Sequence, residues 1–138
     1  MNREEKQLLL KDLCGRLPYG VVCMLSVKDT NVSITEKFVL DGLELFILGT
    51  MEVKPYLRPM PSMTEEEQRY IWNKYGPSPL FADFEDAGDV SELFKYCHMN
   101  ISDANLFVDW LNEHHFDYRG LIKKGLALEA PKDMYKTE

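Results

Sequence analysis

The cysteines and histidines are the residues best suited to covalent or metal chemistry, and their spacing restricts both. They are Cys14, Cys23, Cys97, His98, His114 and His115. Adjacent residues of a helix point about 100° apart, so neither Cys97-His98 nor His114-His115 can hold one metal ion. Three cysteines at these spacings match no zinc or redox motif. We therefore predict no metal site and no cofactor.

A thiolate nucleophile is the other chemistry to consider. Cys97 could meet His114 only through the packing of the two helices predicted to carry them, and a cysteine within hydrogen-bond reach of a histidine is readily activated. The simpler interpretation places Cys97 in the core and His114 and His115 at a helix C-terminus, where histidine stabilises the helix dipole. A small enzyme with a Cys97–His114 site stays as the alternative to a non-enzymatic protein.

The other common catalytic patterns are absent from the sequence. Carboxylates cluster at 83–92, but the stretch lacks the alternation of a calcium loop and has no H-E-x-x-H neighbour. A solvated loop followed by a helix cap explains it better. No phosphate-binding glycine loop and no G-x-S-x-G motif occurs.

The segment from Lys54 to Met60 is the best candidate for binding. Its prolines pre-order the backbone, so Tyr56 and Arg58 could be presented to a ligand at low entropic cost. Tyrosine and arginine are also enriched at binding hot spots. We predict Lys54, Tyr56 and Arg58 as partner- or ligand-binding residues. The alternative is a structural strap that closes one end of the core.

Composition narrows the classes of partner. The chain has 138 residues and a formal net charge of −7, which disfavours nucleic acid and anionic membranes and favours a basic protein partner. No apolar run is long enough to span a membrane. The odd cysteine number and the lack of a signal-peptide pattern predict a cytoplasmic protein. A weaker option is nucleic-acid binding through four cations: Lys54, Arg58, Arg69 and Lys74.

The elements that must position these residues begin with a helix and a sheet. Asn2 and Glu5 have capping-box spacing for a helix at 3–14, with Gly15 as its left-handed end. Strands are predicted at 19–27, 32–40 and 43–50. Asp41-Gly42 between the last two predicts a tight hairpin, so the three strands would form an antiparallel meander.

Helices dominate the rest of the chain. Three prolines between 51 and 63 predict an ordered crossing segment. Three helices should follow, at about 64–75, 89–98 and 103–115, with one more turn at 119–124. The segregation of strands and helices predicts an α+β fold. We expect a single domain over 1–130 and a frayed tail at 131–138.

Three strings cover most of the chain: LLLKDLCGRLPYGV, KPYLRPMPSMTEEE and FVDWLNEHHFDYRGLIKKGLALEAP. With them the chain resembles small proteins encoded by gut anaerobic bacteria and their phages or mobile elements. That family has no assigned activity, so the resemblance implies only a cytoplasmic accessory protein associated with phage or mobile DNA. Together with the missing catalytic motifs, it favours a non-enzymatic interaction or regulatory protein.

Overall fold

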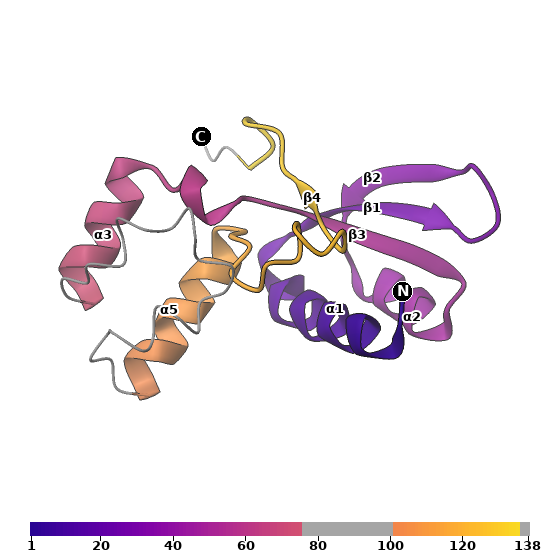
Figure 1. Cartoon of the computed structure of the whole chain (residues 1–138), viewed down its shortest axis with the longest axis horizontal. Coiled ribbons are helices and arrows are strands. Elements are labelled where there is room, and N and C mark those ends of the chain that lie inside the picture. Colours follow the sequence, from indigo (N-terminus) through magenta and orange to yellow (C-terminus); the bar gives the residue numbers. More distant parts are fainter. Residues whose placement is uncertain (76–100, 136–138) are drawn as a thin grey trace. The chain divides into compact units, whose positions relative to one another are not determined.

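A computed structural model describes residues 1–75 and 101–135 (Figure 1). The chain divides into two compact units, and each is described by itself. Unit 1 comprises Met1–Leu57 and Leu121–Glu138, and unit 2 comprises Arg58–Gly120. The single domain over 1–130 stays a prediction.

Unit 1 contains a mixed four-stranded sheet, which confirms the α+β class but only part of the expected meander. The strands are β1 (Val22–Val27), β2 (Ser33–Lys37), β3 (Met51–Leu57) and β4 (Leu128–Glu129), in the order β2-β1-β3-β4. β1 pairs antiparallel with both β2 and β3, whereas β4 pairs parallel with β3. β1 and β2 fall within the predicted strands at 19–27 and 32–40.

The predicted third strand and its hairpin are wrong. Residues Leu40–Leu48 form helix α2, which ends at Gly49 in the left-handed conformation (φ 80°). A short apolar run has no period that separates a strand from a buried helix. Gly42 does not form a hairpin turn. It is needed because the helix backbone passes close to the buried Phe38 ring: a Cβ added at Gly42 would lie 3.0 Å from that ring.

The third strand is β3, inside the segment predicted to be a crossing strap. Leu57 O accepts a hydrogen bond from Ala130 N–H, so the backbone groups of Leu57, and of every second residue before it in β3, point towards the β4 side. Pro55 is one of these residues and has no N–H. Pairing with β4 starts at Tyr56, one residue after Pro55, so no hydrogen bond to β4 is lost at Pro55. A proline is tolerated at such an unpaired position.

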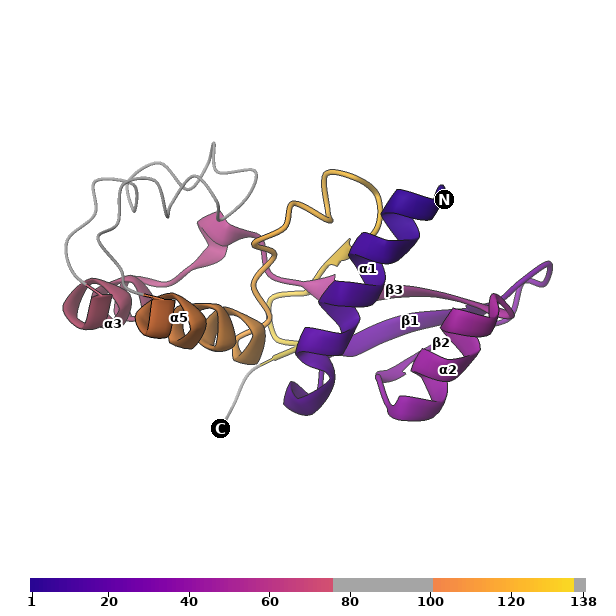
Figure 2. The ribbon, with the colours of Figure 1, turned by 90° about the horizontal axis from the view of Figure 1, so that it is seen from below.

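Two helices cover one face of this sheet (Figure 2). They are α1 (Arg3–Arg16) and α2, with α2 towards the β2 side. The predicted cap is confirmed, because Asn2 Oδ1 accepts the Glu5 N–H at 2.8 Å. Gly15 does not end α1, because the helix continues to Arg16. The Arg16 guanidinium pairs with Asp12 one turn earlier. The left-handed glycine that follows the helix is Gly20. The buried apolar core is Leu9, Leu13, Val21, Cys23, Leu25, Phe38, Phe46, Val53, Leu57, Leu121, Leu126 and Ala127.

The described part of unit 2 contains the helices η2 (Met60–Ser62), α3 (Glu65–Tyr75) and α5 (Ile101–Glu113). The predicted capping box at Thr64 is confirmed: Thr64 N–H donates to Glu67 Oε1 and Glu67 N–H donates to Thr64 Oγ1. The helix expected at 89–98 lies outside the described residues, and 121–125 forms turns instead of a further helix. The core is Met60, Met63, Ile71, Phe107, Leu111, Phe116 and Tyr118.

Candidate functional site

Lys54 and Tyr56 lie on the sheet face that α1 and α2 leave open. Side chains alternate along β3: Val53 and Leu57 are buried on the helix side, while Lys54 and Tyr56 are half-buried on the other. Lys54 is opposite Met24 of β1. Their binding role stays a prediction.

Arg58 begins unit 2 and is engaged within it. Its guanidinium makes two hydrogen bonds to Glu67, at 2.9 and 2.6 Å, and lies 4.1 Å from the centroid of the Phe116 ring. Burial raises the pKa of the Glu67 carboxyl, but the hydrogen bonds from Arg58 and Thr64 outweigh it, so the pKa is lowered overall. These contacts place Arg58 in the packing of unit 2, and its binding role stays a prediction.

His114 of the predicted Cys97–His114 site is held by aromatic stacking. Its ring lies 4.1 Å from the Trp110 ring centroid, and its Nδ1 donates to Trp110 O at 2.9 Å. Because a carbonyl only accepts, Nδ1 carries a proton. Cys97 lies outside the described residues, so the pairing stays a prediction.

The two cysteines of unit 1 differ in exposure. Cys14 is exposed and Cys23 is buried. Burial, reinforced by the nearby Asp12 carboxylate, raises the pKa of the Cys23 thiol to about 12, so it stays protonated at neutral pH. Across 1–75 and 101–135, no three His, Cys, Asp or Glu side chains are grouped as a metal would require.

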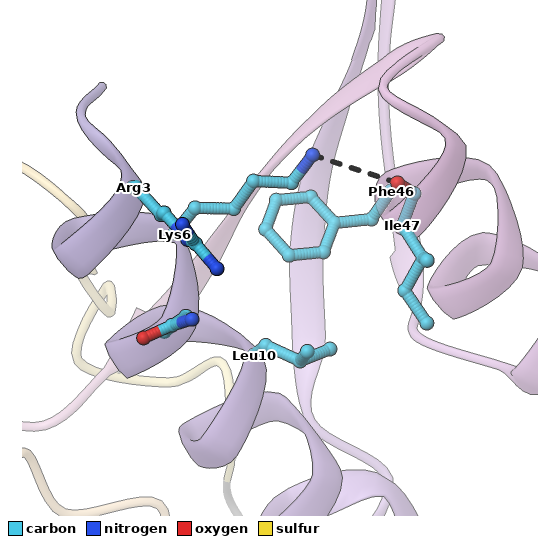
Figure 3. Close-up of a pocket in the computed structure, with 6 residues that line it drawn as sticks. Arg3, Lys6, Leu10, Phe46 and Ile47 are labelled. Carbon is cyan, nitrogen blue, oxygen red and sulfur yellow. Dashed lines mark hydrogen bonds between the residues drawn. The ribbon is translucent and has the colours of Figure 1, made fainter.

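A groove lies between α1 and α2 in unit 1, and the sequence did not reveal it. It has a volume of about 230 Å³ and is lined by Arg3, Lys6, Gln7, Leu10, Phe46 and Ile47 (Figure 3). Lys6 Nζ reaches across it, 5.7 Å from the Phe46 ring centroid and 3.5 Å from Ile47 O. We call it the α1–α2 groove: two cations border an apolar floor.

Helix α2 also exposes unusually many aliphatic side chains. The exposed fractions are 67% for Leu40, 39% for Leu45, 53% for Ile47 and 67% for Leu48. Single exposed aliphatics are normal, whereas a contiguous group indicates an interaction surface. Leu43, Phe46 and Ile47 have the spacing of one face of a helix, which could have indicated this surface. The prediction of a strand at 43–50 placed these residues differently.

No family model, curated protein or solved structure matches this chain. The resemblance to small proteins of gut anaerobes and their phages therefore stays a prediction, and so does the association with mobile DNA. None of the helices described here has the length and apolarity needed to cross a membrane.

Proposed function

We propose that this is a non-enzymatic protein-interaction module whose α1–α2 groove binds a segment of a partner protein. The segment would place an apolar side chain on Leu10, Phe46 and Ile47 and a carboxylate near Arg3 and Lys6. The composition of the groove supports this most directly: its six lining residues include two cations and no acid.

The size of the groove favours a protein segment over a small-molecule substrate. Small-molecule sites typically enclose roughly 300–1,000 Å³ and bury most of their ligand. The groove offers about 230 Å³ and is partly open to solvent. That space suits one or two anchoring side chains from a larger partner. Ile47, which is 53% exposed, extends the apolar surface beyond it.

The net charge of −7 does not decide which charge binds in the groove. At physiological ionic strength the Debye length is about 8 Å, so the nearest charges dominate a contact. Arg3 and Lys6 are those charges here. The acidic remainder of the surface suits the basic partner surface expected from the sequence, outside the groove.

Selection from a peptide library displayed on phage tests this proposal. Selection on the full chain should enrich peptides with an aliphatic or aromatic residue beside Asp or Glu. Lys6→Glu should weaken binding of a selected peptide by about tenfold or more, which corresponds to about 1.4 kcal/mol. Lys11→Glu is the matched control, because Lys11 is an exposed lysine of α1 outside the groove.

Two outcomes would overturn the proposal. One is selection that yields no enriched acidic–apolar pattern. The other is equal weakening by Lys6→Glu and Lys11→Glu, because a general charge effect would then explain the binding without a groove contact. Amide NMR shifts on peptide addition provide the location: they should cluster at Leu10, Phe46 and Ile47.

A further inference from the structure

Strand β2 forms one edge of the sheet in the described part of the chain. The sheet order ends at β2, and all five residues Ser33–Lys37 are exposed. An edge strand presents unpaired N–H and C=O groups that can pair with another strand. Natural edges are commonly protected by charged side chains, proline, a bulge or extreme shortness. The charges of β2 are Glu36 and Lys37 at its end, whereas residues 33–35 carry none. β2 has no proline and pairs with β1 in regular register over all five residues.

Ile34 shows that the apolar layer under this edge is incomplete. It is opposite Leu25 of β1 and therefore points to the helix-covered face, where Leu25 is 5% exposed. Ile34 itself is 49% exposed, and Val32 on the same side is 59% exposed. The helix layer thus ends before the sheet does, and a strip of aliphatic surface stays in water.

Helix α2 contributes aliphatic side chains on the same side. Residues two positions apart in a helix are separated by about 200° around its axis. Leu45 therefore lies on the opposite flank of α2 from the groove residue Ile47. Leu48 shares the flank of Leu45, three residues on. Since Ile47 lines the groove shared with α1, that flank lies on the side of α2 away from α1. Helix α2 itself lies towards the β2 side of the sheet (Figure 2).

We propose that a second copy of this chain covers this edge, with the two β2 strands pairing antiparallel about a two-fold axis at Ile34. The two sheets become one, and Ile34, Leu45 and Leu48 of each copy form an apolar layer beneath the junction. A two-fold interface needs a surface that complements itself, which an antiparallel pairing of identical strands satisfies. The proposal is independent of the α1–α2 groove, which lies on the other flank of α2.

The charges and the length of β2 select this register among those that keep the helix-covered faces of the two sheets on one side. Centring on Ser33 would place Thr35 opposite residue 31, in the turn before β2, so only residues 32–34 could pair as extended backbone. Centring the pairing on Glu36 would place that carboxylate opposite its own copy, which is destabilising. Centring on Thr35 would place Ile34 opposite Glu36. Centring on Ile34 places isoleucine opposite isoleucine, Glu36 opposite Val32 and Thr35 opposite Ser33, with no like charges facing each other.

Sedimentation of the full chain tests the assembly. Wild type should sediment at twice the chain mass of 16.1 kDa, and Ile34→Lys should sediment as a monomer with unchanged circular dichroism. Leu106→Lys is the matched control, because Leu106 is also 49% exposed but belongs to unit 2, so that variant should stay dimeric. Since each copy carries −7, dimerisation should strengthen as salt shortens the Debye length from about 30 Å at 0.01 M to about 8 Å at 0.15 M.

Cross-linking tests the register. In a Cys14→Ser background, Ile34→Cys should form a disulfide-linked dimer with oxidised glutathione, because directly opposed antiparallel residues have Cα atoms about 4.5–5.5 Å apart. Lys37→Cys should not, since its copy would be about six strand residues away. A monomeric wild type at all concentrations, or a dimer that survives Ile34→Lys, overturns the proposal. A wild type that instead recruits a different protein through this edge also overturns it.

Discussion

At the residue scale, the contacts of Arg58 within unit 2 predict a contribution to stability beside its predicted binding role. The sequence singled it out by type and neighbours, and the structure uses it to join α3 to the end of α5 through Glu67 and Phe116. Arg58→Ala should lower the free energy of unfolding of unit 2 by about 1–2 kcal/mol, discounted because the pair is partly exposed. Urea denaturation measures this. Arg69→Ala, at an exposed site on α3, should change it by less than about 0.5 kcal/mol.

Tyr135 has a role that no local sequence pattern indicates. Its hydroxyl accepts the Val22 N–H at 2.9 Å and donates to Tyr56 O at 2.6 Å, so it bridges β1 and β3. Tyr135→Phe should cost about 1–3 kcal/mol of unit 1 stability, because both backbone groups lose their partner. Hydrogen exchange at the Val22 amide should accelerate accordingly. Tyr19→Phe is the control, since no hydrogen bond of that hydroxyl occurs in the described part of unit 1. Equal exchange rates in the two variants would contradict the bridge.

A buried thiol and a half-buried phenol make unit 1 sensitive to alkali. Burial is the main cause that raises the pKa of Cys23 from 9.0 to about 12 and that of Tyr135 from 10.0 to about 12. The unfolded chain therefore loses these protons at lower pH than the folded chain. Their contribution to stability is complete below pH 9 and is lost as pH rises from 9 towards 12. Urea titrations across this window should show the decline. Cys23→Ala should make it shallower, and a decline as steep as that of the wild type would contradict this cause.

At the element scale, α2 is where sequence and structure differ most. Gly42 packs against the Phe38 ring, with 3.0 Å between an added Cβ and Phe38 Cε1. Gly42→Ala should therefore destabilise the fold by about 1–2 kcal/mol, although alanine favours an exposed helix interior by about 1 kcal/mol. Thermal unfolding measures the loss. Gly42→Ala combined with Phe38→Leu should cost less than the sum of the two single variants, because the smaller side chain relieves the contact. Strict additivity would contradict this explanation.

Elements with strong local signals were predictable. Asn2 and the Thr64–Glu67 pair mark helix starts by hydrogen bonds that their own side chains make, so sequence alone identifies them. The strand predicted at 43–50 is replaced by helix α2 at 40–48, and the third strand lies at 51–57 instead, because only tertiary contacts distinguish the two segments. Gly42 acts through Phe38, and Pro55 is tolerated in β3 because β4, over 70 residues later, starts pairing one residue beyond it. The α1–α2 groove depends on that same assignment, so it could not be predicted before α2 was known to be a helix.

At the scale of the whole molecule, unit 2 is an insertion whose two ends are joined. Arg58 N–H donates to His115 O at 2.7 Å and Asp117 N–H donates to Arg58 O at 2.8 Å, which closes the chain where it enters and leaves the unit. Each unit also has a buried apolar cluster of its own. A unit whose two ends are hydrogen-bonded together and whose apolar core is its own can unfold locally while the other unit stays folded.

Two matched core truncations determine whether the units open separately. Leu9→Ala removes a fully buried side chain of unit 1, and Leu111→Ala removes one of unit 2. Each should cost about 2–5 kcal/mol. If the units open independently, Leu111→Ala accelerates amide exchange in Arg58–Gly120 while the β1 and β3 amides keep their protection, and Leu9→Ala does the reverse. Hydrogen exchange read by mass spectrometry separates the two regions. If both variants accelerate exchange equally throughout, the chain unfolds as the single domain that the sequence predicted, since one cooperative unit distributes the loss of either core over all its amides.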